Sequence, residues 1–358
     1  MPETRQVAVK QPALSLLGRG GGSRRASRPR PVLGLLTAVV LLLALIVLSI
    51  TVGSVPVPLR SAFHAFVDFD PTNNEHLIVR DLRLPRTVVG LLAGAALGLA
   101  GGVMQGLARN PLADPGILGV NAGAALFVVC GISFLGVTTI VGYVWFGFAG
   151  AALAAVLVYR IGAMGRDGAT PVKLALSGAA TSAALGSLTT AVLLTDTEAF
   201  DQFRFWQVGS LAGRDLGLVV QTLPFLAVGA VLALVCGRLL NALSMGDDVA
   251  SSLGVNVKAG QVLAAVAVVV LCGTATALAG PIAFVGLAVP HAARLITGPD
   301  YRWILPYSMM LAPSLLLAAD VLGRVFTSPS EVQVGVVTAV IGAPVFIFLV
   351  RRRKLAEL

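Results

Sequence analysis

Long apolar runs without a charged side chain dominate this sequence. The first extends from residue 31 to 59, and similar runs recur as far as residue 350. A helix needs about 20 apolar residues to cross the hydrocarbon core of a bilayer. Only 12% of the residues are charged, against roughly 25% in soluble domains. The chain is therefore predicted to be an all-α, polytopic membrane protein.

The runs predict about ten transmembrane helices. The run 115–159 is about twice the required length, so we expect two helices with a turn at 131–136. Gly280-Pro281 breaks the run 259–293 into a full helix and a shorter one. The predicted spans are 31–59, 87–108, two within 115–159, 174–195, 216–237, two within 259–293, 303–319 and 332–350.

Charged residues between the spans predict the orientation. Lys and Arg are enriched in cytoplasmic loops. With ten spans and a cytoplasmic N-terminus, the loops with a cationic excess all fall on the cytoplasmic side, and so does the basic stretch 351–354. Both termini are therefore predicted to be cytoplasmic. Residues 1–30, rich in Gly, Ser, Arg and Pro, are expected to form a disordered basic tail before a transmembrane domain at 31–358.

Several classes of function are disfavoured. The sequence contains no Walker A, HExxH, GxSxG or dinucleotide-binding motif, so we expect no enzyme activity in this chain. The predicted helix centres contain no acidic residue, which argues against an ion-coupled secondary carrier working alone. The cysteines and histidines have no metal-ligand spacing, and no basic stripe coincides with aromatics. We therefore expect no metal site and no nucleic-acid partner.

Two arginines mark the start of the second span. Arg83 and Arg86 are three residues apart and share a helix face. The topology places them outside, against the charge bias, and Arg324 falls on the same side. An arginine fork binds carboxylates bidentately, so an acidic partner protein would suit these residues. Snorkelling to lipid headgroups and pairing with Asp81 or Asp320 are the alternatives.

Two cytoplasmic segments have distinctive compositions. In the first, prolines and glycines force a tight turn that re-enters the membrane, with Asp114 as a helix N-cap. Its residues of interest are Asn110, Pro111, Asp114 and Pro115. The second reads as a short capped helix with acids in its first turn, which favours docking of a cytoplasmic protein over an interfacial helix lying on lipid. It comprises Gly246, Asp247, Asp248, Ala250, Leu253 and Gly254.

Small residues recur every four positions in the second span. Gly90, Gly94 and Gly98 form a small-xxx-small ladder that lets helix backbones approach closely. Tight packing within the chain explains the ladder, and the wall of a translocation path is the alternative.

Several motifs follow one another in a specific order. They are Arg83-Leu84-Pro85-Arg86, Asn110-Pro111-Leu112-Ala113-x-Pro115-Gly116-x-Leu118-Gly119, Ala250-x-x-Leu253-Gly254-Val255, Gly280-Pro281-Ile282-Ala283-Phe284-Val285-Gly286-Leu287, Pro290-His291-x-x-Arg294 and Asp320-x-x-x-Arg324. Together they resemble the permease subunits of iron–siderophore and cobalamin ATP-binding-cassette importers. The resemblance covers essentially everything after the N-terminal tail.

The resemblance implies an assembly in the cytoplasmic membrane of a bacterium. A second permease subunit, either a copy or a paralogue, would enclose a central path with this one. Two cytoplasmic ATPase subunits would hold ATP and Mg²⁺ and dock on the helix at 247–254, and this chain would bind no cofactor. An extracytoplasmic binding protein would engage Arg83, Arg86 and Arg324. The substrate would be a ferric siderophore, with cobalamin or haem as alternatives, and Ser177, Thr181 and Ser182 would line its path.

Overall fold

The computed structural model describes residues 31–164, 170–327 and 330–356, and all regular elements in these ranges are helical. The predicted tail at 1–30 lies outside them. The first half contains α1 (Pro31–Thr51), α2 (Leu59–Val67), α3 (Asn74–Leu77), the π-helical η1 (Ile78–Arg83), α4 (Leu84–Leu107), the 3-10 helix η2 (Pro115–Leu118), α5 (Val120–Leu135) and α6 (Ile140–Gly162). The second half contains α7 (Pro171–Thr195), α8 (Thr197–Gln207), α9 (Leu216–Leu243), α10 (Asp247–Ser252), α11 (Val257–Ala279), α12 (Val285–Thr297), α13 (Tyr301–Phe326) and α14 (Val334–Ala356).

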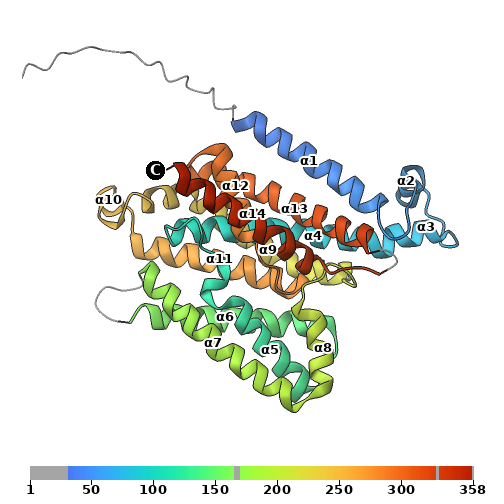
Figure 1. Ribbon diagram of the computed structural model, residues 1–358, viewed down its shortest axis with the longest axis horizontal. Helices are drawn as coiled ribbons and strands as arrows, with labels where there is room; N and C mark the ends of the chain where they lie inside the picture. Colours follow the sequence, from blue (N-terminus) through green and yellow to red (C-terminus); the bar gives the residue numbers. More distant parts are fainter. Residues whose placement is uncertain (1–30, 165–169, 328–329, 357–358) are drawn as a thin grey trace, which may run out of the picture.

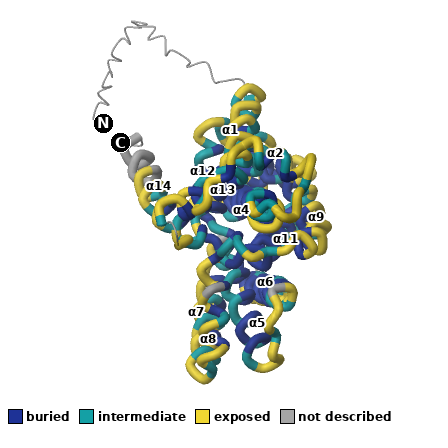
Figure 2. Tube along the Cα trace, turned by 90° about the vertical axis from the view of Figure 1, so that its right-hand side faces the viewer, coloured by how far each residue is buried: buried dark blue, intermediate teal, exposed yellow. Residues whose placement is uncertain are grey.

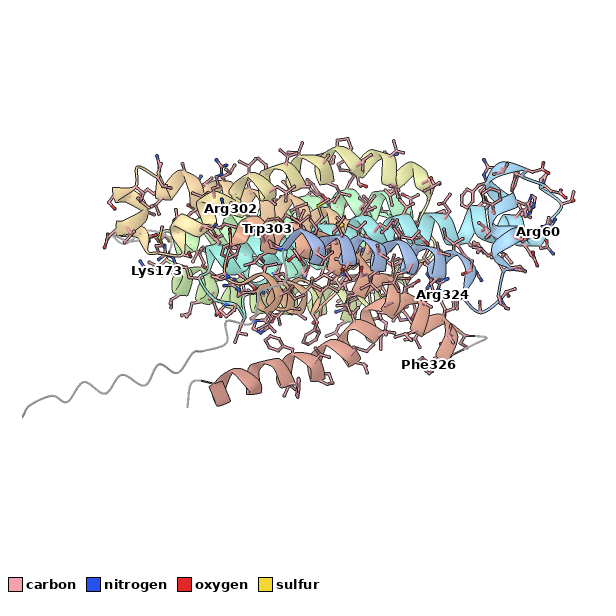
Figure 3. The ribbon with its side chains drawn as sticks, turned by 90° about the horizontal axis from the view of Figure 1, so that it is seen from above. Arg60, Lys173, Arg302, Trp303, Arg324 and Phe326 are labelled. Atoms are coloured by element: carbon pink, nitrogen blue, oxygen red, sulfur yellow. The ribbon has the colours of Figure 1, made fainter. Side chains whose placement is uncertain are left out.

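The long helices run side by side between two ends of the molecule (Figure 1). The loop elements α2 and α3 lie at one end and α10 at the other. Labelled charged residues follow this division: Arg60 and Arg324 lie towards the α2–α3 end, and Lys173 and Arg302 towards the α10 end (Figure 3). Charge at the ends and apolar helices between them are typical of a multi-pass membrane protein.

All ten predicted spans are helices in the structure. Among the described residues, seven helical stretches are long and apolar enough to cross a membrane. They are α1, Asn74–Leu107, α6, α7, α9, α11 and α13. The other three predicted spans correspond to α5, α12 and α14, of which α5 has 16 residues and α12 has 13. The cytoplasmic placement of both termini stays a prediction.

Two predicted breaks have different outcomes. The break at Gly280 is confirmed, because α11 ends at Ala279 and Gly280 adopts a φ of 75°. The turn expected at 131–136 is displaced. Gly131 lies inside α5, where it packs against the Phe146 ring, and the helix ends at Gly136 with a φ of 61°. Gly131 therefore serves helix packing and Gly136 serves the turn.

The central helix of the bundle is α4, which packs against α13, α11, α12 and α9. Figure 2 shows α4 and α11 within the buried interior, with α5 to α8 forming a separate lobe. The glycine ladder explains the close packing. A Cβ on Gly94 would lie 2.5 Å from Pro313 Cα, and one on Gly98 would lie 2.4 Å from the Ser308 carbonyl oxygen of α13. Tight packing within the chain, the first reading of the ladder, is confirmed.

Candidate functional sites at the two ends of the bundle

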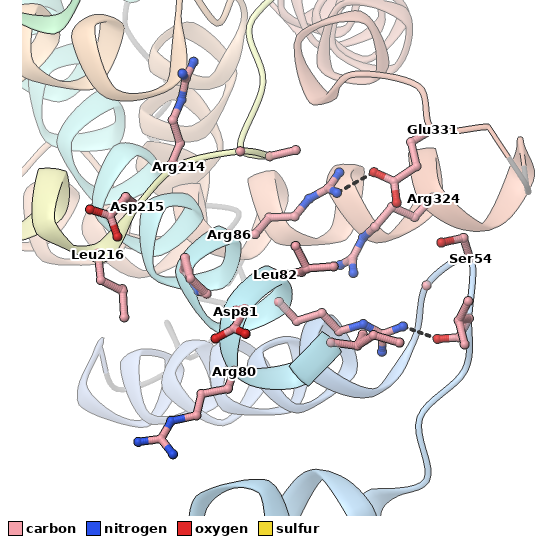
Figure 4. A pocket seen from close by; sticks show the side chains of 17 residues that line it. Ser54, Arg80, Asp81, Leu82, Arg86, Arg214, Asp215, Leu216, Arg324 and Glu331 are labelled. Carbon is pink, nitrogen blue, oxygen red and sulfur yellow. Dashed lines mark hydrogen bonds and ion pairs between the residues drawn. The ribbon is translucent and has the colours of Figure 1, made fainter. Parts of the chain in front are cut away.

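A buried network of charged side chains lies at the α2–α3 end, where α4 meets α13. Arg86 donates from Nε to both oxygens of Asp320, at 2.9 and 3.1 Å, and from Nη2 to Oδ1 at 2.8 Å. The Nη1 group of Arg86 reaches Glu331 Oε2 at 2.5 Å (Figure 4). Arg324 approaches Asp320 Oδ2 at 3.1 Å. Asp320 is fully buried and forms ion pairs with both arginines.

The remaining guanidinium groups join α1 to this network. Arg83 donates to the Ile50 carbonyl oxygen at 2.7 Å and to the carbonyl oxygen of Val55. Arg324 donates to the carbonyl and the hydroxyl oxygens of Ser49, both at 3.2 Å. Gly53 completes the packing, because a Cβ there would lie 2.9 Å from Arg83 Nη2. We call Arg83, Arg86, Arg324, Asp320 and Glu331 the arginine cluster.

The structure corrects the expected accessibility of the three arginines. Arg83, Arg86 and Arg324 are only 5%, 8% and 2% exposed, so they are not free surface groups. The alternative of pairing with Asp320 is confirmed for Arg86, and Arg324 pairs with Asp320 as well. Asp320 itself was expected outside the predicted span, but α13 continues to Phe326 and encloses it. This buried carboxylate is neutralised by arginines and is therefore not available as an ion-coupling site.

A cavity of about 600 Å³ opens beside the arginine cluster. It is lined by four residues of the cluster, all except Asp320, and also by Arg80, Asp81, Arg214 and Asp215. Within the cluster, three guanidinium groups face two carboxylates, Asp320 and Glu331. The side chain of Glu331 is 36% exposed, whereas that of Asp320 is fully buried. Glu331 is thus the one carboxylate of the cluster that an approaching partner could replace.

The predicted helix at the α10 end is present. Gly246, with a φ of 105°, precedes α10, and Gly254, with a φ of 80°, follows it. Asp247 and Asp248 occupy its first turn. Ala250, one of the residues of the predicted docking helix, is fully buried, and α10 packs on α9 and α11. On α10 and immediately beside it, the exposed large apolar side chains are Met245, Val249 and Leu253, which we call the α10 knob.

The predicted turn also has the expected geometry. Asn110 Oδ1 accepts from the Leu112 amide at 2.9 Å, and Asp114 Oδ1 accepts from the Gly116 amide at 2.7 Å, as an N-cap of η2. Pro115 follows as the first residue of η2. The turn then packs closely on α7, where a Cβ on Gly178 would lie 1.7 Å from the Ile117 carbonyl oxygen.

A larger open cavity, of about 1060 Å³, lies between α5, α7 and α8 and the segment that precedes α12. Its α7 lining includes Ser187, Thr189 and Thr190. The hydroxyl residues expected on a path lie elsewhere: Ser177 is buried and bonds to the Val158 carbonyl oxygen, and Thr181 is also buried. Neither they nor Ser182 line this cavity. Ser187 and Thr190, which the sequence analysis did not single out, do line it.

Comparison with known proteins decides the family. Residues 41–352 match the model of the FecCD transport family. This chain belongs to the FecCD transport family. The expected resemblance to chelate-importer permeases is confirmed, and the chain is a multi-pass membrane permease.

Relatives of this FecCD-family chain align with it along most of their length. The ferric enterobactin transport system permease protein of Escherichia coli (strain K12) is 47% identical over 333 residues, covering 93% of this chain and 98% of that protein. The iron(3+)-hydroxamate import system permease protein of Bacillus subtilis (strain 168) is 42% identical, covering 86% and 80%. The cobalamin import system permease protein of Halobacterium salinarum is 40% identical, covering 86% and 82%.

A solved structure has the same architecture. It is described as an inward-facing conformation of an ABC transporter of metal-chelate type. The two chains are 26% identical, with a TM-score of 0.77, and the match covers 90% of this FecCD-family chain and 99% of the other. The predicted all-α permease fold is therefore confirmed over nearly the whole chain.

Proposed function

We propose that this chain is the permease subunit of an ATP-driven importer that moves a ferric siderophore, or a related metal chelate, across the cytoplasmic membrane of a bacterium by alternating access. The observation that best supports this proposal is the 47% sequence identity to the ferric enterobactin permease along nearly the whole of both chains. The cobalamin relative is less similar, at 40%. No relative named above supports a carrier that works alone, so an ion-coupled secondary carrier is not favoured.

The α10 knob is proposed to dock in a cleft of a cytoplasmic ATPase subunit, which binds ATP and Mg²⁺. Exposed apolar side chains on a short projecting helix favour a protein partner. Asp247 and Asp248 on the same helix disfavour an anionic lipid surface. This role places the α10 end in the cytoplasm and both termini with it.

The arginine cluster is proposed to receive an acidic side chain of an extracytoplasmic substrate-binding protein. Its burial changes how Arg83, Arg86 and Arg324 would act. Arg83 and Arg324 hold α1 against α4 and α13, whereas Arg86 keeps Asp320 and exchanges Glu331 for the partner's carboxylate. The net positive charge of the cluster and the cavity beside it support this role.

The open cavity between α5, α7 and α8 is proposed to form half of the translocation path, which a second permease subunit would complete. Small and hydroxylated side chains on α7 leave room for a bulky chelate. The hydroxyl groups of Ser187 and Thr190 bond to carbonyl oxygens one turn back, so they offer diffuse polarity rather than a tight binding site.

Uptake by a reconstituted importer tests the proposed function. Proteoliposomes would contain this chain with its ATPase subunits, and the binding protein would carry ferric enterobactin labelled with radioactive iron. We expect uptake that requires both ATP and the binding protein. Uptake driven by an ion gradient without ATPase subunits would contradict the proposal, and uptake of labelled cobalamin alone would change the substrate.

A further inference from the structure

Arg109 occupies a backbone conformation that favours glycine. Its φ is 49°, in the left-handed region. The Asn110 amide donates to the Gln105 carbonyl oxygen at 3.1 Å, and the Arg109 amide donates to the Gly106 carbonyl oxygen at 3.3 Å. This bond pair is the Schellman motif that closes a helix, and glycine is the usual residue at this position. An arginine here costs about 1 kcal/mol or more of backbone strain.

The side chain of Arg109 gives a reason for that strain. Its Nη2 group donates to Oδ1 of Asp247, and Asp247 is the first residue of α10. Among the described residues, this is the one ion pair that joins α10 to the end of α4. Its side chains are 31% and 51% exposed, and an ion pair so exposed contributes little to stability.

The turn that begins at Arg109 has rigid contacts at its other end. The Ile117 carbonyl oxygen lies against Gly178 of α7, and the ring of Pro115 lies against Gly286 of α12. Gly178 leaves no room for a side chain, and a Cβ on Gly286 would lie 3.2 Å from Pro115 Cδ, so a shift of the turn presses first on α7 and then on α12. Since α7 lines the open cavity, the Arg109–Asp247 pair and the turn connect α10 to that cavity.

We propose that the Arg109–Asp247 ion pair is a transmission link that passes displacements of α10 through the turn to α7. Arg109 is a positioning residue: it contacts no substrate and acts through the turn. This inference rests on the proposed docking of α10 on an ATPase subunit. It also explains why an arginine is found where glycine would be less strained.

The decisive variant is Arg109→Gly, because glycine removes the ion pair and relieves the backbone strain at once. A purely structural role predicts no loss of transport. A transmission role predicts equal or higher thermal stability together with a fall of about two- to five-fold in substrate moved per ATP hydrolysed, the range that one exposed ion pair can supply. Asp247→Asn should have the same effect. Asp201→Asn, which removes a comparably exposed ion pair with Arg204 on α8, is the matched control.

A substrate-free readout separates this inference from the substrate proposal. Ser187→Cys, in a background with Cys130, Cys236 and Cys272 replaced by alanine, reports the open cavity. In the complete complex, maleimide labelling of this cysteine should change when ATP and vanadate trap the ATPase subunits, and Arg109→Gly should remove that change. Failure to transport ferric enterobactin would remove the substrate proposal but leave this result standing.

The exchanged pair Arg109→Asp with Asp247→Arg completes the design. It preserves the summed length of the two side chains and reverses the charges, and aspartate tolerates the left-handed conformation. We expect it to restore the response to ATP. Retention of the wild-type response in Arg109→Gly, or single variants impaired without recovery in the exchanged pair, would overturn the inference. A wild-type chain that ignores ATP would remove both the inference and the proposed function.

Discussion

At the scale of single residues, a few charged side chains of this permease are buried and hold its helices together. The arginine cluster shows this, because sequence topology placed its arginines correctly at the end of the bundle but could not show their burial. The predicted topology placed Asp320 on the same side and offered it as a possible partner of Arg86. The contribution of Glu331 depends on how the loop before α14 folds back, which no local pattern encodes.

Removing the central carboxylate should destabilise the fold. Asp320→Asn leaves Arg86 and Arg324 buried without their shared counter-charge, and breaking a buried pair in this way costs about 3–5 kcal/mol. Thermal unfolding of the purified chain in detergent would measure the loss. Glu331→Gln is the control: its partly exposed pair should cost less than about 1 kcal/mol, while freeing Arg86 to bind the binding protein more tightly. Equal losses of stability would contradict the assignment.

A second residue-scale prediction concerns the stability of the fold at low pH. The Arg302 guanidinium and the Asn241 amide lower the pKa of Asp300 to about 2, and its carboxylate caps α13. A lowered pKa stabilises the fold above the ordinary value of about 3.9, and that stability is lost as the pH falls towards 2. The effect should be about 1 kcal/mol or less after solvent screening. Melting temperatures between pH 5 and pH 2 should fall less steeply in Asp300→Asn than in the wild type.

At the scale of elements, close helix approaches determine which glycines matter. A Cβ on Gly101 would lie 1.8 Å from the Gly286 carbonyl oxygen of α12, whereas nothing lies within 4 Å of a Cβ on Gly186 of α7. Gly101→Ala must therefore separate α4 from α12 and should sharply reduce the folded yield. Gly186→Ala should be neutral or gain up to about 1 kcal/mol from helix propensity. Size-exclusion profiles of the two variants would measure the folded yield of each, and similar profiles would refute the packing argument.

The α10 knob provides an element-scale test of docking. Leu253 is 62% exposed, so Leu253→Asp should leave the fold intact. A charge in an apolar contact with the ATPase subunit should lower its affinity about tenfold or more. Ser251→Asp adds the same charge to an exposed position on the same helix and should change little. Co-purification of the ATPase subunit with each variant measures the difference. Equal binding by both would place the contact elsewhere.

Sequence reasoning predicted elements better than their ends. Hydrophobic runs located every long helix, and Gly280 correctly marked the end of α11. The turn at 131–136 was misplaced because a glycine that serves packing is indistinguishable in sequence from one that ends a helix. The ion pair between Arg109 and Asp247 joins residues far apart in the chain, so the sequence alone does not predict it and the folded structure is needed to identify it.

At the scale of the whole molecule, α7 is uncovered over most of its surface and lies beside the open cavity. Its Leu194 side chain is 81% exposed, and a second permease subunit would cover it. If the proposed second subunit is another copy of this chain, Leu194→Cys should therefore form a disulfide between the two copies under mild oxidation. Leu36→Cys, on α1 at the opposite side of the bundle (Figure 1), should not. A non-reducing gel of membranes would show the difference, and a cross-link at Leu36 alone would reverse the proposed interface.

The short helices α5 and α12 have a consequence for hydration. At 1.5 Å per residue they extend only about 24 and 20 Å, less than the hydrocarbon thickness. Gly286 packs beside Leu97 and Gly101, well inside α4, so the non-helical segment before α12 lies at membrane depth. Non-helical backbone at that depth is tolerated only where protein or water provides hydrogen-bond partners for its amide and carbonyl groups. Pro281 and Ala283 of this segment line the open cavity. A polar chelate would thus remain among water molecules through much of the bilayer, and the dry part of its passage would be far thinner than the membrane.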